Sequence, residues 1–157
     1  MRKRIGTGAA LLAGALAVTG LALAPSAAAV APASATVTAN CGLFGGGAAT
    51  LTATQSGTSA TLTLSSTAIT APIPLGANTI NSTLTMANST GAARVFTGTV
   101  NPAMATGAPI VIGPLNGTVA SGDKLDFRQG SLKMVVFGIT VTCTANAAQA
   151  PGPFVYD

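Results

Sequence analysis

The sequence contains no histidine, no tryptophan and no glutamate, and its three carboxylate side chains all belong to aspartate. The groups that most often act as a general base near neutral pH are therefore missing. A Ser-His-Asp or Cys-His site cannot be assembled, and the imidazole ligands of most zinc and copper sites are absent. We predict a protein that is not an enzyme, with no catalytic residues, no metal ligands and no cofactor.

The few ionisable residues do not form an obvious site either. Asp123 and Asp126 are the only acids in the body of the chain, and calcium takes about six to eight oxygen ligands, so two carboxylates are too few. They alternate with Lys124 and Arg128, which favours local charge pairing on an exposed strand over a glycosidase pair. A Ser-Lys dyad using Lys124 or Lys133 has no nucleophile motif beside it.

The start of the chain has the three parts of a secretory signal peptide in order. The cations Arg2, Lys3 and Arg4 precede an apolar run over residues 9–24, and small residues around Pro25 to Ala29 follow. The apolar run is 16 residues long, whereas a spanning helix needs roughly 20; a retained membrane anchor is the alternative interpretation. We expect cleavage after Ala29, or alternatively after Ala35. The mature protein is predicted to be secreted, extracellular or envelope-associated, without a membrane contact once the signal is removed.

Charged residues make up only 6% of the chain. Three of the seven cations lie in residues 1–29, so the mature chain keeps four cations against three aspartates, a net charge of +1. This balance gives no support for nucleic-acid binding. A nearly neutral surface also lacks the repulsion that keeps molecules apart. We expect a monomer or weak self-association.

The two cysteines, Cys41 and Cys143, predict one disulfide. Oxidising compartments preserve such bonds, and no metal-ligand spacing accompanies the pair. The bond would close a loop over nearly the whole domain and would stabilise it by up to ~4.7 kcal/mol. Two buried free thiols are the alternative.

Alternating polar and apolar residues run through the mature chain, and no apolar stripe has helical spacing. This pattern predicts an all-β domain over residues 30–157, an antiparallel two-sheet sandwich of 7–9 strands that is immunoglobulin-like or jelly-roll-like. Pro72 and Pro74 restrict residues 68–75 to an edge strand or an extended crossover. The expected strands are 36–41, 49–55, 60–65, 79–86, 94–100, 110–112 with or without 115–120, 124–128 and 131–143.

The run from Ser131 to Cys143 is the longest predicted strand, and its odd positions from Val135 to Cys143 are all apolar. The tail from Ala147 to Asp157 is expected to be extended or loosely ordered. Within it, residues 154–156 are either a strand laid on the domain or an exposed motif that a partner captures by strand addition. The predicted core comprises Leu51, Leu62, Leu64, Ile80, Leu84, Phe96, Ile110, Ile112, Leu125, Phe127, Val135, Phe137, Ile139 and Val141.

Several short motifs carry a resemblance: APSAAA and APASA near the start, TVTANCG around Cys41 and ITVTCTA around Cys143. In these the chain resembles small exported proteins of actinobacteria whose function is uncharacterised. The resemblance implies an extracellular β-sandwich and brings no site residues.

The predicted function is a non-catalytic secreted or envelope-associated module, structural or binding, whose partner is an unknown protein or the cell wall. A surface-active or self-assembling coat protein is the alternative, because nearly uncharged strands rich in Thr and Val can pair between chains. A secreted protease inhibitor, using the loop from Asn101 to Pro109, is the third candidate.

Overall fold

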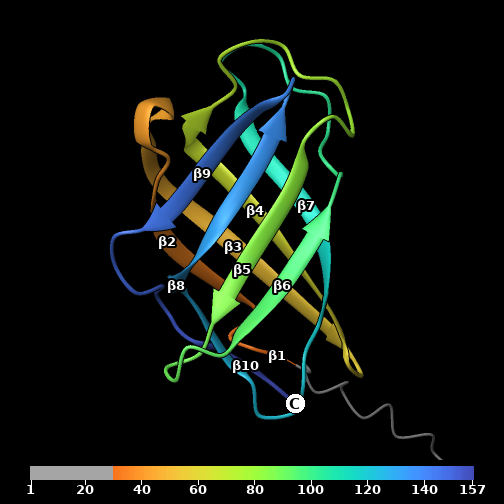
Figure 1. Ribbon diagram of the computed structural model, residues 1–157, viewed down its shortest axis with the longest axis vertical. Coiled ribbons are helices and arrows are strands. Elements are labelled where there is room, and N and C mark those ends of the chain that lie inside the picture. Colours follow the sequence, from red (N-terminus) through yellow and green to blue (C-terminus); the bar gives the residue numbers. More distant parts are fainter. Residues whose placement is uncertain (1–29) are drawn as a thin grey trace, which may run out of the picture.

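The structure is a computed structural model that describes residues 30–157 (Figure 1). The predicted signal peptide, residues 1–29, lies outside the described residues. The described part is all-β, as predicted, and contains no α-helix. Its elements are β1 (Val30–Ala31), β2 (Ser34–Asn40), the 3-10 helix η1 (Gly42–Phe44), β3 (Gly46–Ser56), β4 (Ser59–Thr70), β5 (Asn81–Ala87), β6 (Ala93–Gly98), β7 (Pro109–Thr118), β8 (Lys124–Val136), β9 (Ile139–Ala145) and β10 (Phe154–Tyr156).

Eight of the strands close into an antiparallel barrel. Each pairs with the next in the order β8, β5, β6, β7, β4, β3, β2 and β9, and β9 pairs back onto β8. The prediction of a two-sheet sandwich is therefore corrected to a closed barrel. Alternation places every second side chain inside in either architecture. What distinguishes them is the pairing of β9 with β2, strands about a hundred residues apart, and no local pattern encodes that contact.

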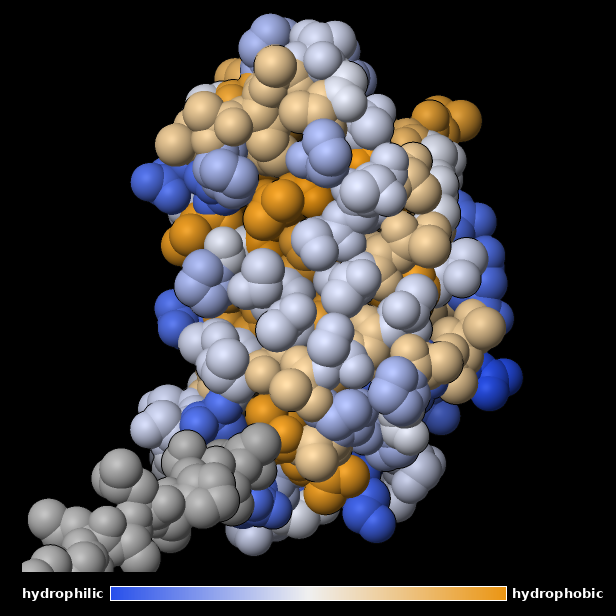
Figure 2. Space-filling model, turned by 180° about the vertical axis from the view of Figure 1, so that it is seen from behind, coloured by the Kyte–Doolittle hydropathy of each residue, from blue (hydrophilic) through white to orange (hydrophobic). Residues whose placement is uncertain are grey.

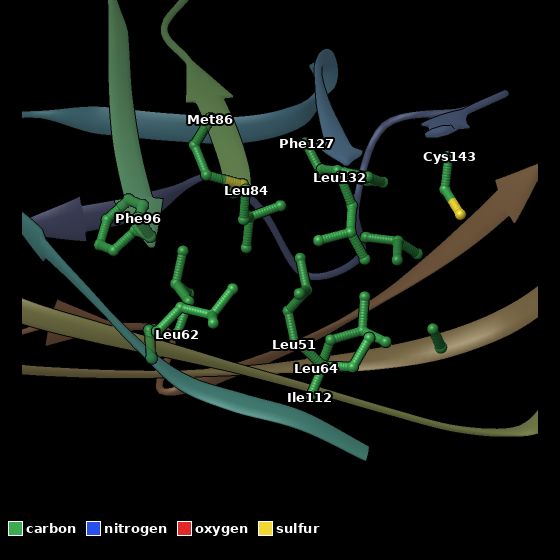
Figure 3. Close-up of a cluster of buried hydrophobic side chains, with 14 of the residues drawn as sticks. Leu51, Leu62, Leu64, Leu84, Met86, Phe96, Ile112, Phe127, Leu132 and Cys143 are labelled. Atoms are coloured by element: carbon green, nitrogen blue, oxygen red, sulfur yellow. The ribbon is translucent and has the colours of Figure 1, made fainter. Parts of the chain in front are cut away.

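The interior is filled by the inward side of every strand. Side chains from β5, β6 and β8 meet those from β3, β4 and β7 across the barrel (Figure 3). Ten of the predicted core residues are buried, from Leu51 to Phe127 along the chain. Val135, Phe137, Ile139 and Val141 are the exceptions: Val141 is partly buried against the core, Val135 is only partly buried, and Phe137 and Ile139 are exposed.

These exceptions share one cause, a turn inside the predicted strand 131–143. The chain reverses at Phe137 and Gly138, so the run is a hairpin made of the end of β8 and most of β9. The reversal changes which positions point inward: Leu132 is buried on β8, whereas Cys143 is buried on β9. Phe-Gly is not the Asn-Gly or Asp-Gly pair that signals a two-residue hairpin turn. The local sequence therefore does not predict the reversal.

Other predicted segments follow the structure more closely. The hairpins β3–β4 and β5–β6 are confirmed. Residues 110–112 and 115–118 belong to one strand, β7, with an irregularity opposite β4 between Leu62 and Leu64. Gly113 lies there with a φ of 108°, and a Cβ on it would come 2.7 Å from the Leu62 carbonyl oxygen. Only glycine fits this close approach.

One end of the barrel is closed by the two short strands. β10 pairs with β1 and β8, and Phe154 and Tyr156 are buried. The interpretation of the tail as a strand laid on the domain is therefore confirmed. Residues 154–156 do not form an exposed motif that a partner could capture. We call this end, which holds the C-terminus in Figure 1, the closed end. At the opposite end lie η1, residues 71–80 and the β8–β9 turn.

Candidate functional site

A cavity of about 530 Å³ occupies the end of the barrel opposite the closed end. It is lined by 22 residues, of which only Thr70 has a polar side chain. Its floor is built from barrel residues that are almost fully buried, including Ile80, Ile112 and Phe127. An eight-stranded barrel is wide enough for side chains to fill it or for one small ligand to fit. Here buried side chains fill the barrel at the closed end, and the cavity occupies the opposite end.

The walls of the cavity come from the β8–β9 hairpin and the disulfide. Leu132, Met134 and Val136 line it from β8, and Val141 lines it from β9. The predicted disulfide between Cys41 and Cys143 is present, and both cysteines line the cavity. The cysteine pair is thus part of the wall of the site as well as a crosslink.

The barrel opens at this point because two neighbouring strands part. β2 and β9 share only two residue pairs, Ala39 with Ala145 and Asn40 with Thr144. Beyond them the chain turns away through η1, while β9 continues along β8 alone. The disulfide joins the two strands where their pairing ends. A gap in strand pairing, held by a covalent bond, is therefore the physical origin of the opening.

Five large apolar side chains surround the opening and are also exposed to solvent. Together they form the apolar rim: Leu43 and Phe44 from η1, Ile73 from residues 71–80, Phe137 from the β8–β9 turn and Ile139 from the start of β9. Leu43 is fully exposed and Phe137 is 68% exposed. Figure 2, seen from behind, shows a hydrophobic group projecting at the upper right, on the side where Figure 1 places η1. Since these residues are both exposed and cavity-lining, the cavity is open to solvent at the rim.

Asn101 holds residues 71–80 over the cavity. Its side chain is buried, with 2% exposure, and all its hydrogen-bonding capacity is directed at this segment and the next residue. Oδ1 accepts from the backbone N–H of Thr79 at 2.9 Å and of Ile80 at 3.0 Å. Nδ2 donates to the carbonyl oxygens of Gly76 at 2.7 Å and Pro102 at 2.8 Å. One amide thus replaces the strand pairing that residues 76–80 lack.

We expect the Asn101→Ala variant to lose about 1–3 kcal/mol of unfolding free energy, because it leaves buried backbone groups without partners. Urea unfolding followed by circular dichroism measures the loss. Asn88→Ala is the matched control: Asn88 Oδ1 accepts from the N–H groups of Thr90 and Ala92, but in a surface turn where water can replace it. Equal losses in the two variants would contradict the assigned role of Asn101.

The ionisable residues considered from the sequence lie away from the cavity. Asp123 forms an ion pair with Arg94, 2.6 Å from Oδ2 to Nε, at the closed end. The expected pairing of Asp123 with its neighbours in sequence is therefore wrong. The hydrogen bond from Arg94 lowers the pKa of Asp123, against a smaller opposing effect of burial. Asp126 accepts from the backbone N–H of Arg128, and Lys133 is exposed on β8.

Burial raises the pKa of the Tyr156 hydroxyl, and the charge of Asp123 raises it further. Tyr156 belongs to the closed end and does not line the cavity. Within residues 30–157, no group of three or more His, Cys, Asp or Glu side chains comes together. No helix in this part of the chain has the length and apolar character needed to span a membrane.

No protein-family model, curated protein or solved structure matches this chain. The candidate site therefore stands on its own geometry. Sequence reasoning missed the cavity and the rim. One signal was available: Leu43 and Phe44 are large apolar residues in the glycine-rich connection after Cys41, where small or polar residues are usual.

Proposed function

We propose that this chain is an exported, non-catalytic binding module that holds the hydrocarbon chain of an amphiphilic ligand in the cavity at the open end of the barrel. The observation that carries the proposal is a cavity of about 530 Å³ with a single polar side chain, Thr70, among its lining residues. Ligand sites typically have volumes of roughly 300–1,000 Å³ and mostly apolar linings. The disulfide supports export, since such bonds persist in oxidising compartments.

The lining also indicates which part of the ligand enters. A buried polar group without a hydrogen-bond partner is costly, and the floor offers no side-chain partner. A polar head group is therefore expected to stay at the rim, in water, near the exposed Thr70. Recognition would depend on length and shape more than on directional contacts. A straight hydrocarbon chain with one polar end meets these requirements.

Self-association through the same end is a second candidate, in line with the coat-protein alternative, because the rim exposes apolar side chains. Assembly by pairing of strand edges has less support. Each of the eight barrel strands already has a neighbour on both sides, and closure removes the free edges that invite pairing between chains.

The test is the affinity of the mature protein for straight-chain carboxylates from octanoate to hexadecanoate, measured by calorimetry below the concentration at which they form micelles. Each buried methylene contributes about 0.8 kcal/mol, so the affinity is expected to rise about fourfold per methylene. It should level off once the cavity is full. No binding at any length, or an affinity independent of length, would overturn the proposal.

A matched pair of variants locates the site. Val141→Phe narrows the cavity from its wall, whereas Val135→Phe makes the same change on the same hairpin outside the cavity lining. We expect Val141→Phe to shorten the length at which the affinity levels off by several methylenes, and Val135→Phe to leave it unchanged. Equal effects of the two variants would place the ligand elsewhere.

A further inference from the structure

The apolar rim is unusual in how it concentrates exposed hydrophobic groups. Seven large hydrophobic side chains of the described residues are exposed, and five of them belong to the rim. They come from three segments separated by up to about 95 residues in sequence, brought together by the fold around one opening. Isolated exposed hydrophobic residues are normal, whereas a contiguous group marks an interaction surface.

Charged residues are absent from the apolar rim, where the exposed hydrophobic residues gather. None of the three rim segments contains a charged residue. Five of the seven charged residues of the described part, Arg94, Asp123, Lys124, Asp126 and Asp157, lie at the closed end, where β10 pairs with the start of β8 and Asp157 contacts Gln55. Arg128 and Lys133 lie farther along β8 and outside the cavity lining. The barrel is therefore polarised along its length, with most of its charges at one end and uncovered hydrocarbon at the other.

Phe137 supplies an independent observation. It has a φ of 50° and Gly138 a φ of 78°, so both central residues of the β8–β9 turn have a positive φ. Such two-residue turns favour Asn or Asp followed by Gly, and a bulky residue in this conformation is strained. The ring does not offset this strain by burial, because it is 68% exposed. A strained, exposed aromatic residue at the tip of a turn points to a contact outside the chain.

We propose that the apolar rim is a docking surface for the lipid membrane, into which its side chains insert without help from charge. A second copy of the chain fits less well. Two rims placed face to face would enclose two cavities of about 530 Å³ each and leave their apolar linings without contacts, which is unfavourable. A bilayer supplies hydrocarbon to the rim and to the cavity at once. This differs from the sequence-based expectation of no membrane contact, because the five rim residues are far apart in the sequence and come together only in the fold.

Docking uses the rim alone and does not require an occupied cavity. Uptake of a chain from the membrane would rest on the proposed function, but docking would not. Attachment of this kind follows the apolar area that is inserted. Attraction between basic residues and acidic lipids, by contrast, weakens with salt. The two mechanisms therefore predict different responses to lipid composition and ionic strength.

The experiment is co-sedimentation of the protein beginning at Val30 with vesicles of phosphatidylcholine, with and without phosphatidylglycerol, at low and high salt. Residues 1–29 are left out because the apolar run would bind vesicles by itself. We expect binding to both compositions, with affinities that agree within about twofold across the salt range, since the rim carries no charge to be screened. Absence of binding to pure phosphatidylcholine, or binding only to acidic vesicles at low salt, would overturn the proposal.

Three variants test the residues. Leu43→Ser should lower the affinity for phosphatidylcholine vesicles about tenfold, given the apolar area lost from a leucine. Val95→Ser is the control, because Val95 is 49% exposed on β6 and does not line the cavity. Phe137→Asn should lower vesicle affinity while raising the midpoint of thermal unfolding by about 2–4 °C, because Asn is favoured in this turn. A purely structural role for Phe137 predicts that both quantities change in the same direction.

Two further outcomes separate the hypotheses. If Val95→Ser weakens vesicle binding as much as Leu43→Ser, or if sedimentation shows a dimer that Leu43→Ser converts to monomer, the rim is not a membrane surface and the inference fails. Vesicle binding without any length-dependent binding of carboxylates would retain the docking surface and remove the proposed function. Carboxylate binding without vesicle binding would retain the proposed function and remove the docking surface.

Discussion

Replacing both cysteines, in the variant Cys41→Ala/Cys143→Ala, is expected to lower the free energy of unfolding by about 2–5 kcal/mol. The bond closes a loop with a sequence separation of 102 residues, for which the loss of chain entropy alone gives ~4.7 kcal/mol. β2 and β9 are paired at only two residue pairs beside the bond. The segment after β9 adds three backbone hydrogen bonds to Thr36 and Thr38 of β2, but these lie on the side away from the cavity, so the disulfide is the last link at the open end. A domain of this size has roughly 5–15 kcal/mol in total. The variant should therefore lose a large share of its stability.

Urea unfolding of the two proteins, followed by far-ultraviolet circular dichroism with and without a reductant, measures this loss. The reductant should destabilise the parent protein and leave the double variant unchanged, which is the internal control. Because both cysteines line the cavity, reduction should also weaken carboxylate binding under conditions where the barrel is still folded. Free thiols in the purified protein, or an unfolding curve that does not respond to reductant, would contradict the prediction.

The all-β class, most of the core and the disulfide could be predicted because each depends on local or compositional signals. Leu62 and Leu64 are buried because they alternate with threonines on one strand, and alternation is visible without knowing the partner strand. Closure is different. It depends on β9 reaching β2, and a sandwich with the same alternating strands has the same sequence signature. The sequence pattern therefore predicts the all-β class, but it does not distinguish a two-sheet sandwich from a closed barrel.

The site could not be predicted because it is made of segments that the sequence separates. Leu43, Ile73 and Phe137 each lie between two strands, and a single exposed hydrophobic residue in the sequence does not indicate a site. Only the fold shows that they surround one cavity. The error at Phe137 had a further cause. Its turn uses a residue that hairpin turns disfavour, so the pattern of residues 131–143 predicts one strand and the wrong inward face on β8, where Leu132 rather than Val135 is buried.

Phe96 holds a second weak seam of the barrel, and the Phe96→Ala variant is expected to lose about 3–5 kcal/mol of unfolding free energy. β6 and β7 pair only through Phe96 with Gly117 and Thr97 with Asn116. The Phe96 side chain is fully buried. It lies against Gly117, where an added Cβ would come 2.8 Å from its Cγ and Cε1 atoms. The ring thus fills the space that the glycine leaves empty and covers the short ladder from inside the barrel.

The contact between ring and glycine predicts a sign change that a double-mutant cycle can detect. Gly117→Ala alone should destabilise the protein by about 1–3 kcal/mol, because the new methyl group overlaps the ring. In the Phe96→Ala background the same methyl group enters vacated space, so Gly117→Ala should be neutral or stabilising. Coupling between touching residues is about 0.5–3 kcal/mol, and urea unfolding of the four proteins resolves it. Additive losses would mean that Phe96 does not pack on Gly117, and the β6–β7 seam would then need another explanation for its stability.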